Sequence, residues 1–590
     1  MSDLAAVVMA LSAAAGAWAA QPLPLGAGLA ISAAALTLRR PLVLCVGVAL
    51  ATSALGARSW AGLRPPATGT WSGSTTLVGD PYRSSGALVV VVRIGAKRVE
   101  AWARGRPATA LGDRLAGEQV WITGRFQPLS PLVRRRMAPR HVAASLSVQS
   151  VGDWAPGDAA SRAANGIRRT LLSGTASLPP SDRALFAGFV LGDDRDESPE
   201  VADDFRASGL THLLVVSGEN VAFVLGLVAP LLRRLGLRGR MVAGLAVLGL
   251  FGVITRWEPS VLRAEAMAAV SLAAASMGRP ASALRMLSLA VTGLLVVDPL
   301  LVGSLGFLLS VGACAGMAFL APPLTRAIPG PRPIASALGV SLAAQAGVAP
   351  LLVPAFGTMP LATIPANLLA VPAAGPLTAW GMGAGLPAGL IGGRAASVAH
   401  LPTRLALWWV AGVARHAALA PLGHVNAVDL AALAVIVAAA ACTGRHRRWW
   451  LAAGAAVLVT AMLPAVAPGA VDGRQIADGA RFWRRDGATL LVVDGARSAG
   501  KLLAGLHQVE ARRLDVVVVT RPGAGTAAAV GPVLARFAPR LLLAAESSRL
   551  PGAQVPAAGT TLALGSLEVT VGAAASRLTV DVAPSGARPP

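Results

Sequence analysis

Charged residues are scarce in this chain: Asp, Glu, Lys and Arg together make up only 14% of its 590 residues. Hydrophobic residues make up 54%, and the mean hydropathy of +0.61 lies outside the range of ordinary soluble domains. This composition excludes a purely soluble globular protein. Apolar runs long enough to cross a hydrocarbon layer of about 30 Å recur near the N-terminus and from about residue 208 to 467. The sequence therefore predicts a polytopic α-helical membrane protein.

Cysteine and histidine are scarce too, and their positions argue against two kinds of site. The three cysteines, Cys45, Cys314 and Cys442, all lie in apolar segments, so they offer no disulfide framework to the polar parts of the chain. The seven histidines show neither H-x-H nor H-x-x-x-H spacing, and no C-x-x-C motif occurs. We therefore expect no metal ion and no cofactor. A G-x-S-x-G motif between a strand and a helix is also missing, which leaves a serine hydrolase without support.

Arginines in short polar loops predict the orientation. Arg39 and Arg40 separate two early apolar segments, and the cluster Arg445, Arg447, Arg448 precedes the last one. Loops rich in Lys and Arg remain in the cytoplasm, so we expect residues 58 to about 180 and 470 to 590 on the outer face of the cytoplasmic membrane. The first apolar run, Leu4 to Ala20, lacks a basic segment before it, which favours a retained helix over a signal peptide.

The first outer segment is basic and rich in β-forming residues. Residues 58 to 170 hold 17 Lys and Arg against six Asp and Glu, and this excess is nearly half of the net charge of +23. The short runs "ALVVVVRI", "RVEAWARG" and "EQVWITGRF" predict strands and a small β-barrel. On the outer face the charge indicates a polyanionic partner. The candidate DNA-binding residues are Arg93, Lys97, Arg98, Arg104, Arg106, Arg125, Arg134, Arg135 and Arg136.

Aromatic side chains lie among these basic strands: Trp71, Tyr82, Trp102, Trp121 and Phe126. They offer stacking surfaces for unpaired bases, as in barrels that bind single strands. The alternative is that the aromatics form the core, while the arginines face water or touch anionic lipid headgroups.

The last outer segment has a different pattern. "ATLLVVDGA", "LDVVVVTRPG" and "PRLLLAAE" predict buried strands, and the run between the first two predicts a helix, which together make a βαβ unit. Gly495 to Lys501 fits G-x-x-x-x-G-K, but Leu502 stands where a Ser or Thr would hold magnesium. We therefore expect no internal ATP-driven motor.

Polar residues interrupt the apolar core most densely in "FRASGLTHLLVVSGENV", residues 205 to 221. His212 and Glu219 are seven residues apart, and Ser217 and Asn220 flank Gly218. Irregular backbone at membrane depth is tolerated only where it is buried in protein or lines a water-filled cavity. The cluster therefore predicts a broken helix beside a wet cavity.

A second polar group follows in "EPSVLRAEAMAA", residues 258 to 269. A charge at the centre of a bilayer costs at least about 2.5 kcal/mol, so Arg263 is expected to pair with Glu219 or to face a passing phosphate. The alternative is that Glu258, Arg263 and Glu265 reach the membrane interface. Further polar candidates lie along the later segments: Ser310, Gln345 and Asn367.

Four ordered motifs resemble the ComEC family of competence membrane channels. They are "FRASGLTHLLVVSGENV", "SVLRAEAMAAVSLAAASMGRP", "DPLLVGSLGFLLSVGACAGM" and "QAGVAPLLVPAFGTMPLATIPANLLAVP". The resemblance implies transport of single-stranded DNA through the cytoplasmic membrane during natural transformation. The family's motif positions fall on Phe205, Arg206, Gly209, Leu210, His212, Ser217, Gly218, Asn220, Arg263, Gly306, Phe307, Ser310, Gln345, Pro350 and Asn367. The candidate pathway residues are Arg206, His212, Ser217, Gly218, Glu219, Asn220, Arg263, Ser310, Gln345 and Asn367.

The resemblance also implies four regions: N-terminal membrane helices (1–57), an outer OB-like β domain (58–180), a channel core (181–467) and a metallo-β-lactamase-like C-terminal domain (468–590). This sequence departs from the family at two places. Leu308 stands where many members carry Gln, and residues 518 to 531 lack the family's H-x-H-x-D-H zinc motif. Without ligands the C-terminal domain cannot activate a metal-bound hydroxide, so it is not expected to be an enzyme.

The expected partners are single-stranded DNA, membrane lipid, a DNA receptor on the outer face, and a cytoplasmic motor or single-strand-binding protein. Two other functions stay open on this evidence. One is a membrane-anchored nuclease or hydrolase that uses the C-terminal domain. The other is a transporter of another anionic polymer or lipid, because positive charge alone does not distinguish DNA from other polyanions.

Overall fold

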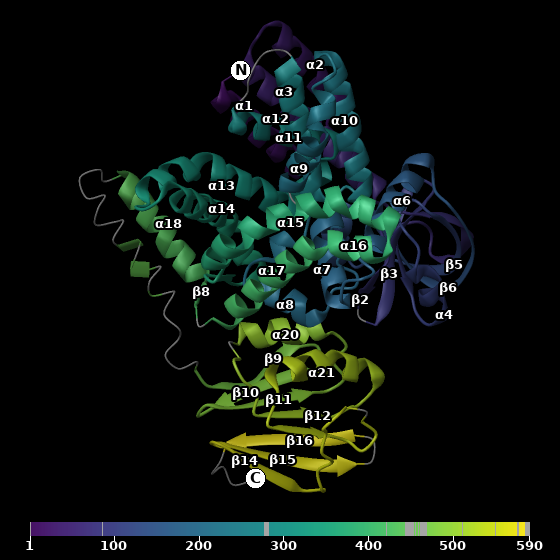
Figure 1. Cartoon of the computed structure of the whole chain (residues 1–590), viewed down its shortest axis with the longest axis vertical. Coiled ribbons are helices and arrows are strands. Elements are labelled where there is room, and N and C mark those ends of the chain that lie inside the picture. The colour runs from purple at the N-terminus through teal and green to yellow at the C-terminus, as the bar shows by residue number, and fades with distance from the viewer. Residues whose placement is uncertain are drawn as a thin grey trace.

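The computed structural model describes residues 2–84, 86–216, 218–276, 282–420, 422–442, 453–454, 456–457, 460, 469–509, 511–548, 550–574 and 577–584. The structure has three parts: helices, a β domain and a C-terminal region of sheets (Figure 1). Helices occupy one end of the molecule and its middle, a basic β domain lies beside the middle, and the C-terminal sheets form the opposite end.

The chain begins with three apolar helices: α1 (Asp3–Ala19), α2 (Leu25–Thr37) and α3 (Pro41–Gly62). The apolar runs of the sequence, at 4–20 and at about 25–38 and 41–57, predict these helices, although α3 continues to Gly62. The helices approach each other closely because glycine faces the contact: a Cβ at Gly16 would lie 2.1 Å from the carbonyl oxygen of Ala49. Small residues at such contacts are typical of helices that associate within membranes.

Six strands form the β domain: β1 (Gly69–Leu77), β2 (Tyr82–Ser84), β3 (Ala87–Ile94), β4 (Lys97–Ala103), β5 (Gln119–Gln127) and β6 (Val142–Ala155). The three predicted strand runs coincide with β3, β4 and β5. The sheet order is β1-β5-β6-β4-β3-β2, and β1 also pairs with β3 through Thr76 and Leu77. Short helices α4 (Arg106–Gly112), α5 (Pro131–Met137) and η1 (Ala138–Arg140) connect the strands.

Alternation of side chains explains why these strands enclose a core. In β5 the residues Val120, Ile122, Gly124 and Phe126 are buried, while the residues between them face outward or are half-buried. A strand with one buried face shows this period of two. Phe126 also packs against Trp71, with ring centroids 6.2 Å apart. These two predicted stacking aromatics therefore belong to the core.

The helical middle starts at α6 and is interrupted several times. Its elements are α6 (Ala159–Gly174), α7 (Pro180–Leu191), α8 (Pro199–Ala207), η2 (Thr211–Leu213), α9 (Gly218–Leu232), α10 (Leu237–Ile254), α11 (Pro259–Ser276), α12 (Ala283–Val297), η3 (Pro299–Gly303), α13 (Leu305–Ala327), α14 (Arg332–Phe356), β7 (Met359–Pro360), α15 (Thr363–Ile391), α16 (Gly393–Ala399), α17 (Leu401–Leu419), β8 (His424–Val425) and α18 (Ala427–Cys442).

Five helical stretches among the described residues are long and apolar enough to cross a membrane: Pro41–Gly62, Thr211–Leu232, Leu237–Ile254, Leu305–Ala327 and Arg332–Phe356. Shorter apolar helices accompany them at Asp3–Ala19, Leu25–Thr37, Ala283–Val297 and Ala427–Ile436. Many large apolar side chains on these helices are exposed in the isolated chain, such as Leu42 and Leu231. A hydrocarbon environment covers such faces, so the chain is a membrane protein.

The C-terminal region holds two sheets. One has the order β13-β12-β11-β10-β9, and the other has the order β14-β15-β16. The strands are β9 (Val471–Ala477), β10 (Ala480–Arg485), β11 (Ala488–Val493), β12 (Val516–Val519), β13 (Leu541–Ala544), β14 (Thr560–Leu564), β15 (Leu567–Ala574) and β16 (Arg577–Pro584), with helices α20 (Ala499–Gln508) and α21 (Ala524–Phe537). Strands β11, β12 and β13 are parallel, which confirms the predicted βαβ unit.

Candidate functional site

The chain breaks its helical path between α8 and α9, inside the densest polar motif. Gly209 follows α8 with a φ of +73°, and a Cβ there would lie 1.8 Å from the Thr363 Oγ1. Both features require glycine. Residues 214 to 216 after η2 are not helical, and the Val216 carbonyl accepts a hydrogen bond from the Ser260 Oγ at 2.7 Å. The motif is therefore an interrupted helix whose backbone is partly satisfied by a side chain of α11.

Three of the predicted pathway residues meet where α9 begins. The Arg263 Nε on α11 donates a hydrogen bond to the Ser310 Oγ on α13 at 2.6 Å, and its Nη1 lies 3.3 Å from the Met267 Sδ. A Cβ at Gly218, the first residue of α9, would lie 3.4 Å from the Arg263 Nη2. Residues Gly218, Arg263 and Ser310 thus form one cluster, which we call the arginine cluster.

Burial distinguishes two expectations for this motif. Arg263 and Glu265 are each only 7% exposed, so both side chains are enclosed by protein rather than extended along its surface. The guanidinium of Arg263 contacts Ser310 and Met267 instead of the predicted partner, Glu219. Asn220 is also buried, and its amide donates to the Phe189 carbonyl at 3.1 Å. The interrupted helix is thereby tied to α7.

The other predicted pathway residues are distributed around the cluster. Asn367 on α15 donates to the Ser341 Oγ on α14 at 3.1 Å, and Gln345 lies one helical turn after Ser341. Arg206 and His212 are exposed on α8 and η2, away from these contacts. Glu219 approaches α15, because a Cβ at Gly375 would lie 2.8 Å from its Oε1. Ser217 lies outside the described residues.

The predicted DNA-binding cations do not form one patch. Three of them surround the β3–β4 hairpin (Arg93, Lys97, Arg98), three lie at the far end of β4 and on β5 (Arg104, Arg106, Arg125), and three lie on α5 (Arg134, Arg135, Arg136). Along β4 the first two groups are about 20 Å apart. The β domain therefore presents several basic surfaces.

Exposed aromatic rings lie on the outer surface of β5 and β6. Trp121 is 50% exposed and Trp154 is 49% exposed, and the Arg114 guanidinium lies 4.3 Å from the Trp154 ring centroid. Trp121 shares the outward face of β5 with Arg125. Sequence reasoning found Trp121 but missed Trp154 and Arg114, whose proximity depends on the β5–β6 pairing.

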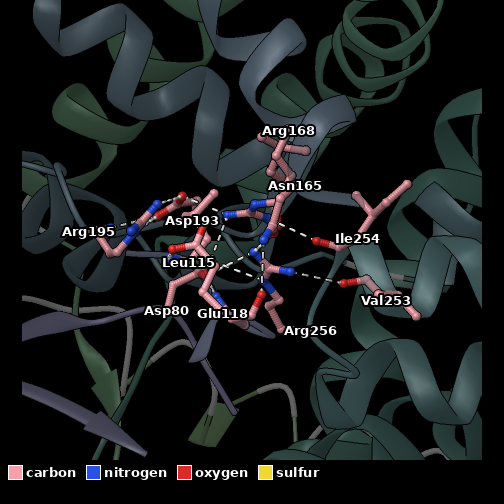
Figure 2. A network of polar contacts seen from close by, with 12 residues as sticks. Asp80, Leu115, Glu118, Asn165, Arg168, Asp193, Arg195, Val253, Ile254 and Arg256 are labelled. Atoms are coloured by element: carbon pink, nitrogen blue, oxygen red, sulfur yellow. Dashed lines mark hydrogen bonds and ion pairs between the residues drawn. The ribbon is translucent and has the colours of Figure 1, made fainter. Parts of the chain in front are cut away.

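Sequence reasoning also missed a buried ionic network between the β domain and the helices, shown in Figure 2. Arg168 of α6 contacts Asp80 at 3.0 Å and Asp193 at 2.7 Å through the Nη2. Arg256, after α10, also contacts Asp80 at 2.9 Å, and Arg195 contacts Asp193 at 2.6 Å. We call these five residues the junction network.

The arginines of the junction network keep its two carboxyl groups ionised. Burial alone would raise the pKa of the Asp80 carboxyl, but the charges of Arg168, Arg256 and Arg195 outweigh it and hold the pKa below its ordinary value. The pKa of Asp193 is also lowered: burial opposes ionisation, and Arg195 and Arg168 overcome it. The network therefore stays ionised near neutral pH and fixes the β domain on the helices.

The C-terminal domain contacts the helical middle through a second ionic group. Asp203 of α8 accepts a hydrogen bond from the His507 Nε2 at 2.8 Å and lies 3.4 Å from the Arg536 Nε. The Arg536 Nη1 also pairs with Asp204. Because Asp203 is fully buried, these contacts hold α20 and α21 directly on α8, as Figure 1 shows.

The motif Gly495 to Lys501 runs from the end of β11 into the start of α20. Lys501 pairs with Asp478 at 3.0 Å on the surface, and Leu502 is buried in the domain core. At the carboxyl end of β11, Asp494 pairs with Arg521 and accepts from the Thr520 hydroxyl at 2.8 Å. No group of three or more His, Cys, Asp or Glu side chains able to hold a metal lies among the residues that the structure describes.

Comparison with known proteins identifies the region that contains the arginine cluster. Residues 189–450 match the family described as Competence protein. ComE operon protein 3 of Bacillus subtilis (strain 168) is 28% identical over 213 residues, which cover 35% of this chain and 26% of that protein. The match thus spans about a quarter of the relative's length. No solved structure matches the chain. The family match and the relative support a ComEC-family competence protein, to which the four ordered motifs also point.

Proposed function

We propose that this protein carries one strand of DNA through the cytoplasmic membrane during natural transformation. The observation that supports this most directly is the arginine cluster, because it sets a buried guanidinium beside an interrupted membrane helix. Charged groups within a membrane bundle usually mark the path of a substrate or ion. Membership of the competence family points to DNA as that substrate.

We also propose that the chain crosses the membrane several times, with its β domain outside. Asp3 at the start of α1 pairs with Arg285 at the start of α12, whereas Asp298 at the end of α12 pairs with His141 of the β domain. The arginines of the connections on the Asp3 side are Arg39, Arg40, Arg233, Arg234, Arg238, Arg240, Arg285, Arg326 and Arg332. Such enrichment supports a cytoplasmic position for that side.

The C-terminal domain belongs on the same outer side in this proposal. Its anchor, α8, lies between Asp193 of the junction network and the start of α9, so one short segment touches both polar domains. This adjacency supports a common side for the two domains.

For the two polar domains we propose an OB-like and a metallo-β-lactamase-like fold, within about the predicted boundaries. The pairings of β1 with β5 and with β3 support the first, because they link β1-β5-β6-β4-β3 into a circuit. OB-type barrels bind single strands with such strand faces. The parallel β11-β12-β13 sheet with α20 and α21 supports the second.

The proposed path begins at the exposed surface of the β domain. Trp121, Trp154 and Arg125 offer stacking and phosphate contacts that do not depend on base sequence. Arg263 then offers one contact within the membrane. Weak contacts at several sites are needed, because a polyanion bound tightly at one site would not move on. A receptor outside and a cytoplasmic motor or single-strand-binding protein supply capture and direction.

The surface part of this proposal is tested by DNA binding to the full-length chain in detergent. A fluorescent single-stranded oligonucleotide should bind with an affinity that falls steeply with salt. Replacing Arg104, Arg106 and Arg125 by Gln should reduce the slope of log K against log salt by about 2, since each lost phosphate contact contributes about 0.7. An unchanged slope contradicts this surface as the DNA site. Equal binding of inorganic polyphosphate of similar length, which has no bases, would instead favour a general polyanion transporter.

A further inference from the structure

A basic cavity lies where the last turn of α3 meets the β domain. It has a volume of about 610 Å³, and its walls include Ser59 and Gly62 from α3 and the β3–β4 hairpin on the other side. His141 forms part of its surface, and Leu63 closes its end. Neither the arginine cluster nor the exposed tryptophans belong to this cavity. It is therefore a separate feature of the β domain.

Three cations crowd the hairpin wall of the cavity. Arg93 and Arg98 stand directly opposite each other on β3 and β4, and Lys97 is the next residue along. Like charges at directly opposite positions destabilise a sheet unless an anion lies between them. Burial lowers the pKa of Arg98, and the charge of Asp298 only partly offsets this effect. The hairpin thus carries positive charge that its own strands do not balance.

Carboxylates of the described residues do not neutralise this charge. None lies within 4.0 Å of the Arg93, Lys97 or Arg98 side-chain nitrogens in the part of the chain that the structure describes. Asp298, the acid whose charge acts on Arg98, pairs with His141 at 2.8 Å. The charge of its lining therefore suits the cavity to an anionic group such as a phosphate, and its volume leaves room for more of the molecule that carries this group.

The cavity lies at the end of a candidate membrane span, and this position indicates which anion it can bind. Its α3 wall, residues 59 to 62, is the end of a candidate membrane span. Trp60, in the same turn, is 39% exposed, and tryptophan at the end of a membrane span is enriched at the level of the lipid headgroups. Leu63, which lines the cavity, also packs with Ala138 of the β domain and with Leu300 of η3. Lipid phosphates occupy this level.

We propose that this cavity binds the phosphate of an anionic phospholipid from the leaflet on the β-domain side. Arg93, Lys97 and Arg98 hold the phosphate, and the exposed rim at Trp60 faces the glycerol and the start of the acyl chains. The bound lipid neutralises the opposed arginines and seats the β domain on the membrane. This inference does not require DNA transport. A DNA strand is the less favoured occupant, because it would have to lie within the headgroup layer.

Thermal unfolding of the full-length protein in detergent tests the proposal, since a ligand that binds only the folded state raises the Tm. Phosphatidylglycerol should raise the Tm, whereas phosphatidylcholine and inorganic phosphate should have little effect. The triple variant Arg93→Gln, Lys97→Gln, Arg98→Gln should weaken phosphatidylglycerol binding at least about tenfold. The matched variant Arg104→Gln, Arg106→Gln, Arg125→Gln removes the same charge about 20 Å away and should keep the response.

Each other outcome overturns the proposal. If both triple variants respond to phosphatidylglycerol alike, the lipid effect does not arise at the hairpin. If inorganic phosphate alone matches the lipid, the cavity is a free-phosphate site. If a single-stranded oligonucleotide displaces the lipid from the intact protein and the hairpin variant loses oligonucleotide binding, the cavity is part of the DNA surface. Should the triple variant fail to fold, Lys97→Gln alone should show a partial loss of the lipid response.

Discussion

Arg263 of α11 and Ser310 of α13 are joined by a 2.6 Å hydrogen bond from the guanidinium Nε to the hydroxyl Oγ. The hydroxyl orients the guanidinium but leaves its charge uncompensated, and the Met267 sulfur adds only a weak acceptor. Among the described residues, no carboxylate oxygen lies within 4.0 Å of this side chain. A fixed, buried and unbalanced positive charge is suited to transient contact with a phosphate.

The junction network should dominate the docking of the β domain. We expect Arg168→Met to lower the free energy of unfolding by about 3–5 kcal/mol, because it leaves Asp80 and Asp193 buried with fewer partners. Thermal unfolding of the purified full-length protein measures this. The control is Lys501→Met, which breaks the exposed ion pair with Asp478 and should lower the free energy of unfolding by no more than about 1 kcal/mol. Similar losses in the two variants would contradict a structural role for the network.

Acid should remove the stabilisation that the junction network provides. The folded-state pKa values of Asp80 and Asp193 lie below the ordinary value of 3.8, so their pairing stabilises the protein fully above that pH. The stabilisation is lost as the pH falls through the lowered values. The stability difference between the intact protein and Arg168→Met should therefore be constant at pH 5 to 8 and shrink below about pH 4. A difference that persists unchanged in acid would mean that packing, not charge, explains it.

Glu197, between α7 and α8, should have the opposite dependence on pH. Burial and the nearby charge of Asp194 raise its pKa from 4.5 to about 7. Its ionised form therefore destabilises the folded state above pH 7, and this penalty disappears as the pH falls towards 4.5. Glu197→Gln should stabilise the protein by about 1–2 kcal/mol at pH 8 and have no effect at pH 4. Unfolding midpoints at the two pH values decide this, and equal shifts would contradict the raised pKa.

Two glycines of the competence motifs should respond differently to alanine. Gly209 needs a positive φ and has Thr363 against it, so Gly209→Ala should destabilise the protein by at least about 2 kcal/mol. Gly306 lies on α13 with open space around it, so Gly306→Ala should be neutral or slightly stabilising. Yields of folded protein and unfolding temperatures give the comparison. Equal tolerance at the two positions would contradict the described turn after α8.

Docking of the C-terminal domain should depend on Arg536. Replacing it by Gln removes the contacts with Asp203 and Asp204, so we expect faster amide hydrogen exchange in α8. Arg540→Gln is the matched control, because the Arg540 side chain is 82% exposed and its Nε lies 3.9 Å from the Asp515 Oδ1. If exchange in α8 is the same in the two variants, the ionic contacts do not hold the domains together.

Local patterns predicted the first three helices, two groups of strands and one helix of the C-terminal domain. The apolar runs predicted α1 and α2 almost to the residue and α3 except for its last five residues, and the β-rich runs predicted β3 to β5 and β11 to β13. These patterns suffice because hydrophobic periodicity acts over a few residues. The motif around Gly218 was found because polar groups are conspicuous in an apolar segment.

Long-range polar contacts were out of reach. Arg168 and Asp80 are 88 residues apart, and Arg256 and Asp80 are 176 apart. Each looked like a surface charge, because nothing in the local sequence marks its partner. The same limit explains why the sequence indicated Glu219 as the partner of Arg263, whereas the structure has Ser310. The choice depends on how α11 packs on α13.

The most direct measurement follows labelled DNA in cells that take it up, with DNA bound outside scored separately from DNA protected inside. Cells would carry the intact gene, a deletion, Asn220→Ala with Arg263→Ala, or Arg540→Ala as a surface control, at matched protein levels in the membrane. A DNA conduit predicts that external binding persists while protected DNA is lost in the deletion and in the double variant, but not in the control. Undiminished protection in the deletion strain would contradict a role in DNA passage, and undiminished protection in the double variant would exclude the arginine cluster from the path.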